Sequence, residues 1–227
     1  ALADNTTANH NTAVGYYALR LNTTGAYNIA VGNYALDANT DGATNIAIGY
    51  AALGSNTSAI RNNALGHGAL GSTTTGSRNV GVGYAALNAN TTGNYNTAVG
   101  NEALTANTTA SYNTALGHNS LGSNTTGERN TAIGSNALDA NTTAVENVAI
   151  GYNALTANTT GTRNVCVGNY TLEDTVTGTN NAAFGSHALS NNTGSYNTAC
   201  GDGAAAANTS GTQNTAVGAF AFDANTT

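Results

Sequence analysis

The sequence is built from a 17-residue repeat that keeps its register along almost the whole chain. Each repeat follows the pattern Asn-[Thr/Ile/Val]-Ala-[Val/Ile/Leu]-Gly-x-x-Ala-Leu-x-x-Asn-Thr-Thr-Gly-x-x, and positions 1 to 17 are counted from its first Asn. The repeats begin at Asn11, Asn28, Asn45, Asn62, Asn79, Asn96, Asn113, Asn130, Asn147, Asn164, Asn181, Asn197 and Asn214. In arrays with such a period, each repeat packs only on its neighbours. The chain is therefore predicted to form a solenoid in which equivalent positions stack into columns.

The repeats cover the whole chain, so we expect one repeat domain at residues 1–227. Residues 1–10 match the second half of a repeat, residues 11–213 form full coils, and residues 214–227 form another partial coil. The repeat that begins at Asn181 is one residue short, between Asn192 and Gly194. Solenoids normally end in an atypical capping repeat. None is recognisable, so we interpret the chain as a segment of a longer protein.

The composition of each repeat favours short strands over helices. Gly at positions 5 and 15 and the Asn-Thr-Thr sequence between them all disfavour a helix. Residues 11–15 and 147–151 illustrate a strand of four or five residues, and the Ala-Leu pair at positions 8 and 9 is expected to lie on a second short strand. Coils stacked about 4.8 Å apart would pair these strands in parallel. The predicted fold is an all-β parallel β-solenoid with two short strands per coil.

Positions 3 and 4 are neighbours on the first strand and point to opposite faces of it, yet both are apolar in almost every repeat. We expect the larger side chains at position 4 to form the core of the coil. This predicted core column comprises Val14, Val31, Ile48, Leu65, Val99, Ile133, Ile150 and Val167. The small side chains at position 3 suggest that another chain packs closely there. This predicted inter-chain face comprises Ala13, Ala30, Ala47, Gly81, Ala98, Ala115, Ala149 and Cys166. A strand buried on both faces needs a covering layer, so we expect side-by-side or intertwined copies of the chain.

The repeats also resemble those of a known family. Asn-Thr-Ala-Val-Gly at residues 11–15, 96–100 and 214–218, and Asn-Val-Ala-Ile-Gly at residues 147–151, resemble the repeats of trimeric autotransporter adhesin heads of the YadA-like type. The repeats also resemble those of phage tail fibres. The resemblance implies a left-handed β-roll and a homotrimer. It also implies a surface-displayed, non-enzymatic fibre that binds host matrix, cell-surface glycan or another cell.

The two Asn columns, at positions 1 and 12, are expected to be structural, because stacked amides can hydrogen-bond from coil to coil. Many position-12 residues, such as Asn90 and Asn158, also begin Asn-x-Thr sequons, which accept N-glycans in a eukaryotic secretory route. We interpret them mainly as a turn motif. The Thr column at position 13, which includes Thr23 and Thr40, could match an ice lattice. Its residues lie beside Gly, however, where a turn rather than a flat strand is expected.

Position 17 is the most suggestive column for ligand binding, because it collects four of the five Arg and several Tyr. Arg pairs with carboxylates or sulfates, and both residue types are enriched in interfaces. The candidate ligand-facing stripe comprises Tyr27, Arg61, Arg78, Tyr95, Tyr112, Arg129, Arg163 and Tyr196. The alternative is that these side chains stabilise the fold by stacking and by ion pairs among Arg129, Glu146 and Arg163. The remaining Tyr, at positions 6 and 7, are expected to shield an edge of the coil.

Composition argues against several functions. The five basic residues are all Arg and face eleven acidic ones, so with a net charge of -6 the chain lacks the basic surface that nucleic acid requires. No run of residues approaches the roughly 18 apolar ones of a membrane span. His and acidic residues fall in different columns or on distant coils, so no metal site, cofactor or paired-carboxylate catalytic site is expected within one chain. Cys166 and Cys200 lie two repeats apart and are expected to be buried free thiols, beyond disulfide reach.

We therefore expect a non-enzymatic, structural or adhesive segment of an extracellular fibre at a cell or virion surface. Its expected partners are copies of itself, as a homotrimer or a longer polymer, together with a cell-surface glycan or matrix protein. Two alternatives remain open. A self-assembling extracellular filament would use the same repeats, and an ice-binding solenoid would use the Thr column.

Overall fold

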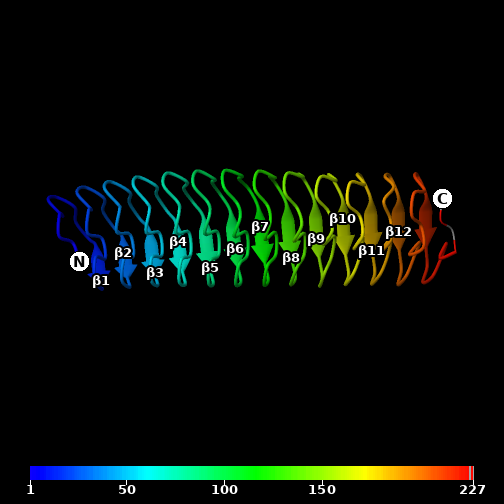
Figure 1. The fold of residues 1–227 in the computed structure, drawn as a ribbon, viewed down its shortest axis with the longest axis horizontal. Helices are drawn as coiled ribbons and strands as arrows, with labels where there is room; N and C mark the ends of the chain where they lie inside the picture. The colour runs from blue at the N-terminus through cyan, green and yellow to red at the C-terminus, as the bar shows by residue number, and fades with distance from the viewer. Residues whose placement is uncertain (225, 227) are drawn as a thin grey trace. The chain divides into compact units, whose positions relative to one another are not determined.

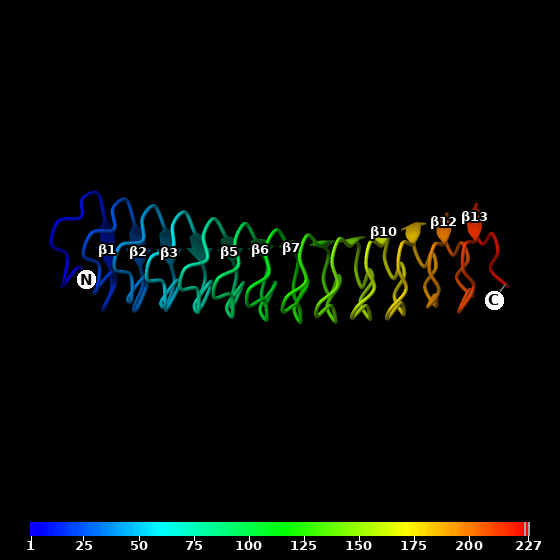
Figure 2. The same ribbon diagram turned by 90° about the horizontal axis from the view of Figure 1, so that it is seen from above.

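The computed structural model describes residues 1–224 and 226. They form two compact units, an N-terminal unit of residues 1–112 and a C-terminal unit that starts at Asn113. Both units are built from the same coil, and Figures 1 and 2 show successive coils of each unit following one another in chain order. No described residue lies in an α-helix.

Each repeat contributes one three-residue strand at positions 2 to 4. The strands of the N-terminal unit are β1 (Thr12–Val14), β2 (Ile29–Val31), β3 (Ile46–Ile48), β4 (Asn63–Leu65), β5 (Val80–Val82) and β6 (Thr97–Val99). Those of the C-terminal unit are β7 (Thr114–Leu116), β8 (Thr131–Ile133), β9 (Val148–Ile150), β10 (Val165–Val167), β11 (Ala182–Phe184), β12 (Thr198–Cys200) and β13 (Thr215–Val217). Within each unit, consecutive strands pair in parallel and position for position, as in the pairing of Ala13 with Ala30. The predicted all-β parallel β-solenoid is confirmed.

The prediction of a second strand at the Ala-Leu pair is wrong. The Leu at position 9 has a left-handed backbone conformation, with φ of 49° at Leu19 and 50° at Leu36. The same conformation recurs at positions 7 and 17, so each coil turns at three places that a strand could not follow. Coil-to-coil hydrogen bonds continue through these turns, as from Leu19 N to Ala35 O at 3.0 Å. The chain therefore stays paired with its neighbours even where it is not a strand.

The faces of the strand are the reverse of those predicted. Position 3 points into the coil: Ala13 is half-buried, and Ala30, Ala47, Gly81, Ala98, Ala115, Ala149 and Cys166, predicted to pack against another chain, are buried within their own chain. Position 4 points outward: Val14, Ile48, Leu65 and Val167, predicted to be core, are exposed, and Val31, Val99, Ile133 and Ile150 are half-buried.

The reason for this reversal is the Leu at position 9. It is fully buried in eleven consecutive repeats, from Leu19 to Leu189, and its side chain fills the interior of the coil. A Cβ added at Gly81, a position-3 residue, would lie only 3.3 Å from the side chain of Leu70. The coil is so narrow that its interior holds only one large apolar side chain per repeat. The strand residue that faces this Leu must therefore be small.

Buried Asn columns complete the core, as predicted. At position 1, the Asn45 amide donates to Ala59 O at 2.8 Å, and its Oδ1 accepts from the backbone N of Asn62 at 3.0 Å. At position 12, the Asn39 amide donates to Asn22 Oδ1 at 2.7 Å and to Gly42 O at 3.0 Å. Position-12 residues of the sequons, such as Asn90 and Asn158, have no exposed surface, which supports the interpretation of these sequons as turns.

Two Thr residues interrupt the position-12 column. Where Thr73 replaces Asn, neither its own Oγ1 nor Asn56 Oδ1 in the coil before it has a hydrogen-bond partner among the described residues, although both are buried. Asn158 Oδ1 is likewise unpaired before Thr175. The Thr175 hydroxyl itself donates to Asn192 O at 2.6 Å. Each replacement therefore leaves a local defect in the ladder of its unit.

The short coil keeps its strand and its core. β11 pairs with β12 in the usual register, and the Asn181 amide still donates to Gly194 O, at 3.0 Å. The missing residue is absorbed at the turn between Asn192 and Gly194, where the Asn192 amide donates to the same carbonyl at 2.9 Å. The deletion therefore changes only a corner of the coil, where the sequence places it.

Candidate functional site

The stripe predicted at position 17 is exposed along both units. Tyr27, Tyr112 and Tyr196 keep 57–61% of their surface open to solvent. Each of the predicted stripe residues has a left-handed backbone, with φ between 57° and 63°. The residues concerned are Tyr27, Arg61, Arg78, Tyr95, Tyr112, Arg129, Arg163 and Tyr196. The turn geometry therefore projects this column outward whatever its side chain.

In the N-terminal unit the stripe is stacked on itself. His10 stacks on Tyr27 with ring centroids 4.8 Å apart, and Tyr95 stacks on Tyr112 at 5.1 Å. The Arg78 guanidinium lies over the Tyr95 ring, 5.1 Å from its centroid, and donates to the Tyr95 hydroxyl. The stacked faces of these rings are therefore covered by neighbouring coils, while more than half of the surface of Tyr27 and Tyr112 remains exposed.

In the C-terminal unit the stripe is an ion-pair ladder. Glu146 accepts from Arg163 Nε at 3.0 Å and from Arg129 Nε at 3.2 Å. The hydrogen bond from Arg163, more than that from Arg129, lowers the pKa of Glu146 below its ordinary value. These contacts match the stabilising alternative for the stripe. Arg61 and Tyr196 lie in the same column without a ring or ion-pair contact among the described residues.

A second exposed column, at positions 6 and 7, forms a more continuous aromatic ladder in the N-terminal unit. We name these residues the aromatic ladder: Tyr16, Tyr17, Tyr34, Tyr50, His67 and Tyr84. Neighbouring rings lie 3.9 to 5.7 Å apart. Sequence reasoning treated these Tyr only as edge shields. The available signal was their recurrence at adjacent positions in consecutive repeats.

A charged pair lies beside the start of the aromatic ladder. The Arg20 guanidinium lies over the Tyr17 ring, 4.4 Å from its centroid. It donates from Nε to Asp37 Oδ1 at 2.8 Å and from a terminal nitrogen to Oδ2 at 3.2 Å. The hydrogen bond to Asp37 raises the pKa of Arg20. This two-point contact fixes both side chains and neutralises the carboxylate.

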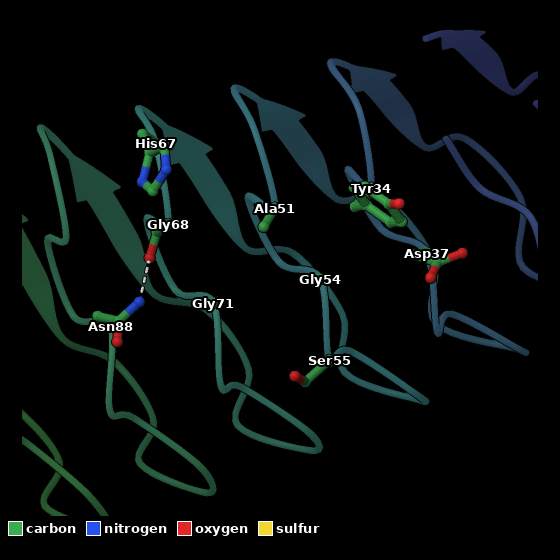
Figure 3. A pocket seen from close by; sticks show the side chains of 9 residues that line it. All are labelled: Tyr34, Asp37, Ala51, Gly54, Ser55, His67, Gly68, Gly71 and Asn88. Atoms are coloured by element: carbon green, nitrogen blue, oxygen red, sulfur yellow. Dashed lines mark hydrogen bonds between the residues drawn. The ribbon is translucent and has the colours of Figure 1, made fainter. Parts of the chain in front are cut away.

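A pocket of about 380 Å³ opens next to this pair. We name it the notch. It is lined by Tyr34, Asp37, Ala51, Gly54, Ser55, His67, Gly68, Gly71 and Asn88. Figure 3 shows Tyr34 and Asp37 on one side, His67 and Asn88 on the other, and only the short side chains of Ala51 and Ser55 between them.

The notch exists because two consecutive repeats lack large side chains at positions 7 and 10. These positions are Ala51 and Gly54 in one repeat and Gly68 and Gly71 in the next. The preceding repeat carries Tyr34 and Asp37 at the same places, so the missing side chains leave a gap in both columns. This paired loss of bulk is readable in the sequence, but it points to a pocket only once positions 7 and 10 are known to border the same space.

The outer face of each sheet is uncharged, with an apolar column at position 4 and a mixed apolar and Thr column at position 2. Position 2 holds Thr, Ile, Val, Ala or Asn, and position 4 holds an aliphatic residue, Phe184 or Cys200. Val14, Leu65 and Leu116 are 59%, 48% and 46% exposed. We name these two columns the outer sheet face. The prediction that Cys200 is buried is wrong, because it lies on this face, whereas Cys166 is buried in the coil as predicted.

The Thr column has much of its hydrogen-bonding capacity engaged. The Thr23 hydroxyl donates to Thr40 O at 3.0 Å, and the Thr91 hydroxyl donates to Thr108 O at 3.0 Å. These bonds join successive coils, as the Asn ladders do inside. The Thr column therefore has a structural role, because its hydroxyl groups donate hydrogen bonds to the backbone of the next coil.

Metal-binding sites and membrane-spanning helices are the next features to consider. Within residues 1–224 and 226, no three His, Cys, Asp or Glu side chains gather as a metal site would require. The same residues include no helix long and apolar enough to cross a membrane. No protein-family model, curated protein or solved structure matches the chain. The outer sheet face, the aromatic ladder and the notch are therefore the features on which function can be argued.

Proposed function

We propose that this chain is a non-enzymatic structural segment of an extracellular fibre at a cell or virion surface. Three copies pack together through their outer sheet faces and present their remaining columns to a cell-surface or matrix ligand. The observation that carries the proposal is the uncovered apolar face of a parallel sheet. Parallel sheets are almost always covered on both faces, and here the coil covers only one.

The outer sheet face is large enough to hold copies together. With strands about 4.8 Å apart and three residues long, six or seven strands give about 300 Å² of flat sheet in each unit. Pairing this face with that of a second chain would bury about 600 Å² for each unit, so pairing of both units would bury about 1,200 Å², within the range of specific interfaces. Apolar patches of about 300 Å² or more are often functional.

A copy of the same chain is the partner that fits this face best. The face carries no charged residue, so two copies meet without desolvating an ion. Within each unit its side chains repeat at the spacing of the coils, and a copy has the same spacing, so the side chains of one copy can fit between those of the other. Three copies around one axis would each bury one face, the arrangement that the adhesin resemblance implies.

The decisive experiment is the native mass in solution, measured by light scattering after size exclusion, combined with the reactivity of Cys200 toward a thiol reagent. We expect three times the chain mass of 22.5 kDa, with Cys200 protected in the particle and reactive when it is dissociated. Cys166 is the internal control. Burial raises the pKa of its thiol to about 12, so it should react only on unfolding.

Charges placed on the outer sheet face test the same contact. Leu65→Asp and Leu116→Asp put a carboxylate on this face in each unit and should yield single chains. Thr75→Asp and Thr126→Asp, at exposed position 14, should leave the mass unchanged. A native monomer, or a particle in which Cys200 reacts freely, contradicts the proposal. A dimer retains the contact but removes the three-fold arrangement, and very long particles of mixed length favour the filament.

A further inference from the structure

The notch in the N-terminal unit has the construction of a small-molecule site. Its volume of about 380 Å³ lies at the lower end of the range for such sites. It combines an aromatic wall with a few polar groups from four consecutive coils, as Figure 3 shows. Neither the fibre role nor the packing of copies accounts for it.

The aromatic wall of the notch is held in place. Tyr34 is half-buried, and its ring is fixed by edge contacts to Tyr17 and Tyr50, each with centroids 5.7 Å apart. On the opposite side, His67 stacks between Tyr50 at 5.1 Å and Tyr84 at 5.4 Å. Both rings are therefore ordered before a ligand arrives, which reduces the entropy lost on binding.

The polar groups of the notch suit a neutral ligand. The Asp37 carboxylate accepts from Arg20 at both oxygens, 2.8 and 3.2 Å away, so its charge is compensated while each oxygen keeps capacity to accept. Asn88 donates one amide hydrogen to Gly68 O at 2.7 Å and retains a second donor and an acceptor. Ser55 adds an exposed hydroxyl. No Arg is among the residues that line the notch, so an anion would find no direct partner there.

Of the three glycines that open the notch, Gly68 has a left-handed backbone conformation with φ of 65°, and the other two are not required by the backbone. Gly54 and Gly71 are not among the glycines with positive φ. The same position carries Asp37, Asn88 or Thr105 in neighbouring repeats. A Cβ at Gly54 would lie 3.2 Å from Ala51 O, 3.4 Å from Tyr34 O and 3.6 Å from Ala51 Cα, all of them backbone atoms. The coil can therefore accept a side chain at Gly54 with a small adjustment, and what its glycine provides is space.

We propose that the notch binds one ring of a neutral sugar. Tyr34 supplies an apolar surface for the C–H face of the ring. Asp37, Ser55 and Asn88 supply the acceptors and donors that its hydroxyl groups need. A cation is disfavoured because Arg20 already neutralises the carboxylate. The proposal goes beyond the fibre role, because it requires only one chain and holds whatever the number of copies.

The test is a titration of the protein with methyl glycosides of glucose, galactose, mannose and N-acetylglucosamine, followed by saturation-transfer NMR. We expect saturable binding of at least one of them, with a dissociation constant on the order of 1 mM, as for a single small ring. Gly54→Thr fills the notch and should weaken binding at least tenfold. Tyr34→Ala removes the wall and should do the same, and Ala51 and Ala85 show that Ala is accepted at this position.

The matched control is Tyr170→Ala, which removes the half-buried Tyr at the same position of a repeat in the C-terminal unit and should leave binding unchanged. Thermal unfolding of each variant distinguishes loss of the site from loss of the fold. Absence of saturation at about ten times the expected constant overturns the proposal, as does equal binding by the parent and Gly54→Thr. Stronger binding of methyl sulfate or tetramethylammonium than of any glycoside overturns the assignment to a neutral ligand. A monomeric native mass would refute the fibre packing and leave this site intact.

Discussion

The N-terminal and C-terminal units share their buried columns and differ in what they expose. Both contain Leu at position 9, small residues at position 3 and Asn at positions 1 and 12. The N-terminal unit displays the aromatic ladder and the notch, whereas the C-terminal unit displays the ladder formed by Arg129, Glu146 and Arg163. At the places equivalent to the notch, the Asn119 amide donates to Asp139 at 2.8 Å, and burial raises the pKa of this carboxyl. The same buried packing thus recurs in both units, while the exposed residues vary independently of it.

The largest loss of stability should come from substituting a buried position-1 Asn in each unit. Asn45→Ala in the N-terminal unit and Asn147→Ala in the C-terminal unit each leave a buried backbone N–H without its partner. Each also removes one of the two amides that donate to a buried carbonyl, so that only the position-12 Asn still donates to it. Each should lower the free energy of unfolding by about 3 kcal/mol or more, measured by urea denaturation and by hydrogen exchange of the next coil. Thr24→Ala and Thr160→Ala, at exposed sites, are the controls. A unit that tolerates its substitution would show that the two interiors are not equivalent.

Adjacent residues on one strand test which face is inside. Ala47→Val overfills the coil against the buried Leu and should cost about 1–3 kcal/mol, as should Ala149→Val in the C-terminal unit. Ile48→Ala and Ile150→Ala, one residue further along, should cost less in a dissociated chain and act mainly by weakening assembly. Thermal unfolding of dilute samples and native mass together separate the two effects. A larger loss at Ile48 than at Ala47 in the dissociated chain would reverse the assignment of the faces.

Repair of the Asn ladder should stabilise the N-terminal unit more than the C-terminal unit. Thr73→Asn gives a partner to Asn56 Oδ1 and removes a second unpaired atom, Thr73 Oγ1. Its expected gain is about 1 kcal/mol in urea denaturation. Thr175→Asn also supplies a donor but forfeits the bond from Thr175 to Asn192 O, so its gain should be smaller. Equal gains, or a loss at Thr73, would show that the unpaired atoms carry no cost.

The smallest effect is a pH dependence confined to the C-terminal stripe. Because Arg163 and Arg129 lower the pKa of Glu146 in the folded chain, its contribution is fully present above the ordinary value of 4.5 and is lost as the pH falls through the lower folded value. Arg163→Gln should flatten this part of the thermal-midpoint profile, and salt should weaken it. Arg78→Gln in the N-terminal stripe is the control and should leave the profile unchanged. An unchanged profile in Arg163→Gln would remove the ion pair as its cause.

The sequence predicted the features that depend on the period alone. Parallel pairing, the Asn ladders, the contacts among Arg129, Glu146 and Arg163, and the corner that absorbs the deletion all follow from stacking equivalent positions. None requires knowledge of how the chain turns within a coil.

The features missed depend on those turns. Alternation along a strand shows that positions 3 and 4 face opposite ways but does not say which faces the coil. That is decided by the left-handed conformation at residues such as Leu36, which directs the large side chain inward and leaves room only for Ala or Gly opposite. Leu rarely adopts this conformation, so a propensity argument assigns it to a strand. The notch was missed for the same reason, since positions 7 and 10 become neighbours only through these turns.

The short coil has a consequence for how such a chain can diversify. The absence of one residue between Asn192 and Gly194 leaves the strand pairing and the buried amides in place. The length of a coil can therefore change at this corner while the buried residues keep their contacts. This corner is therefore a place where a coil can change in length, and the equivalent corner recurs in each full repeat. The array can thus acquire new surfaces one coil at a time while its interior remains unaltered.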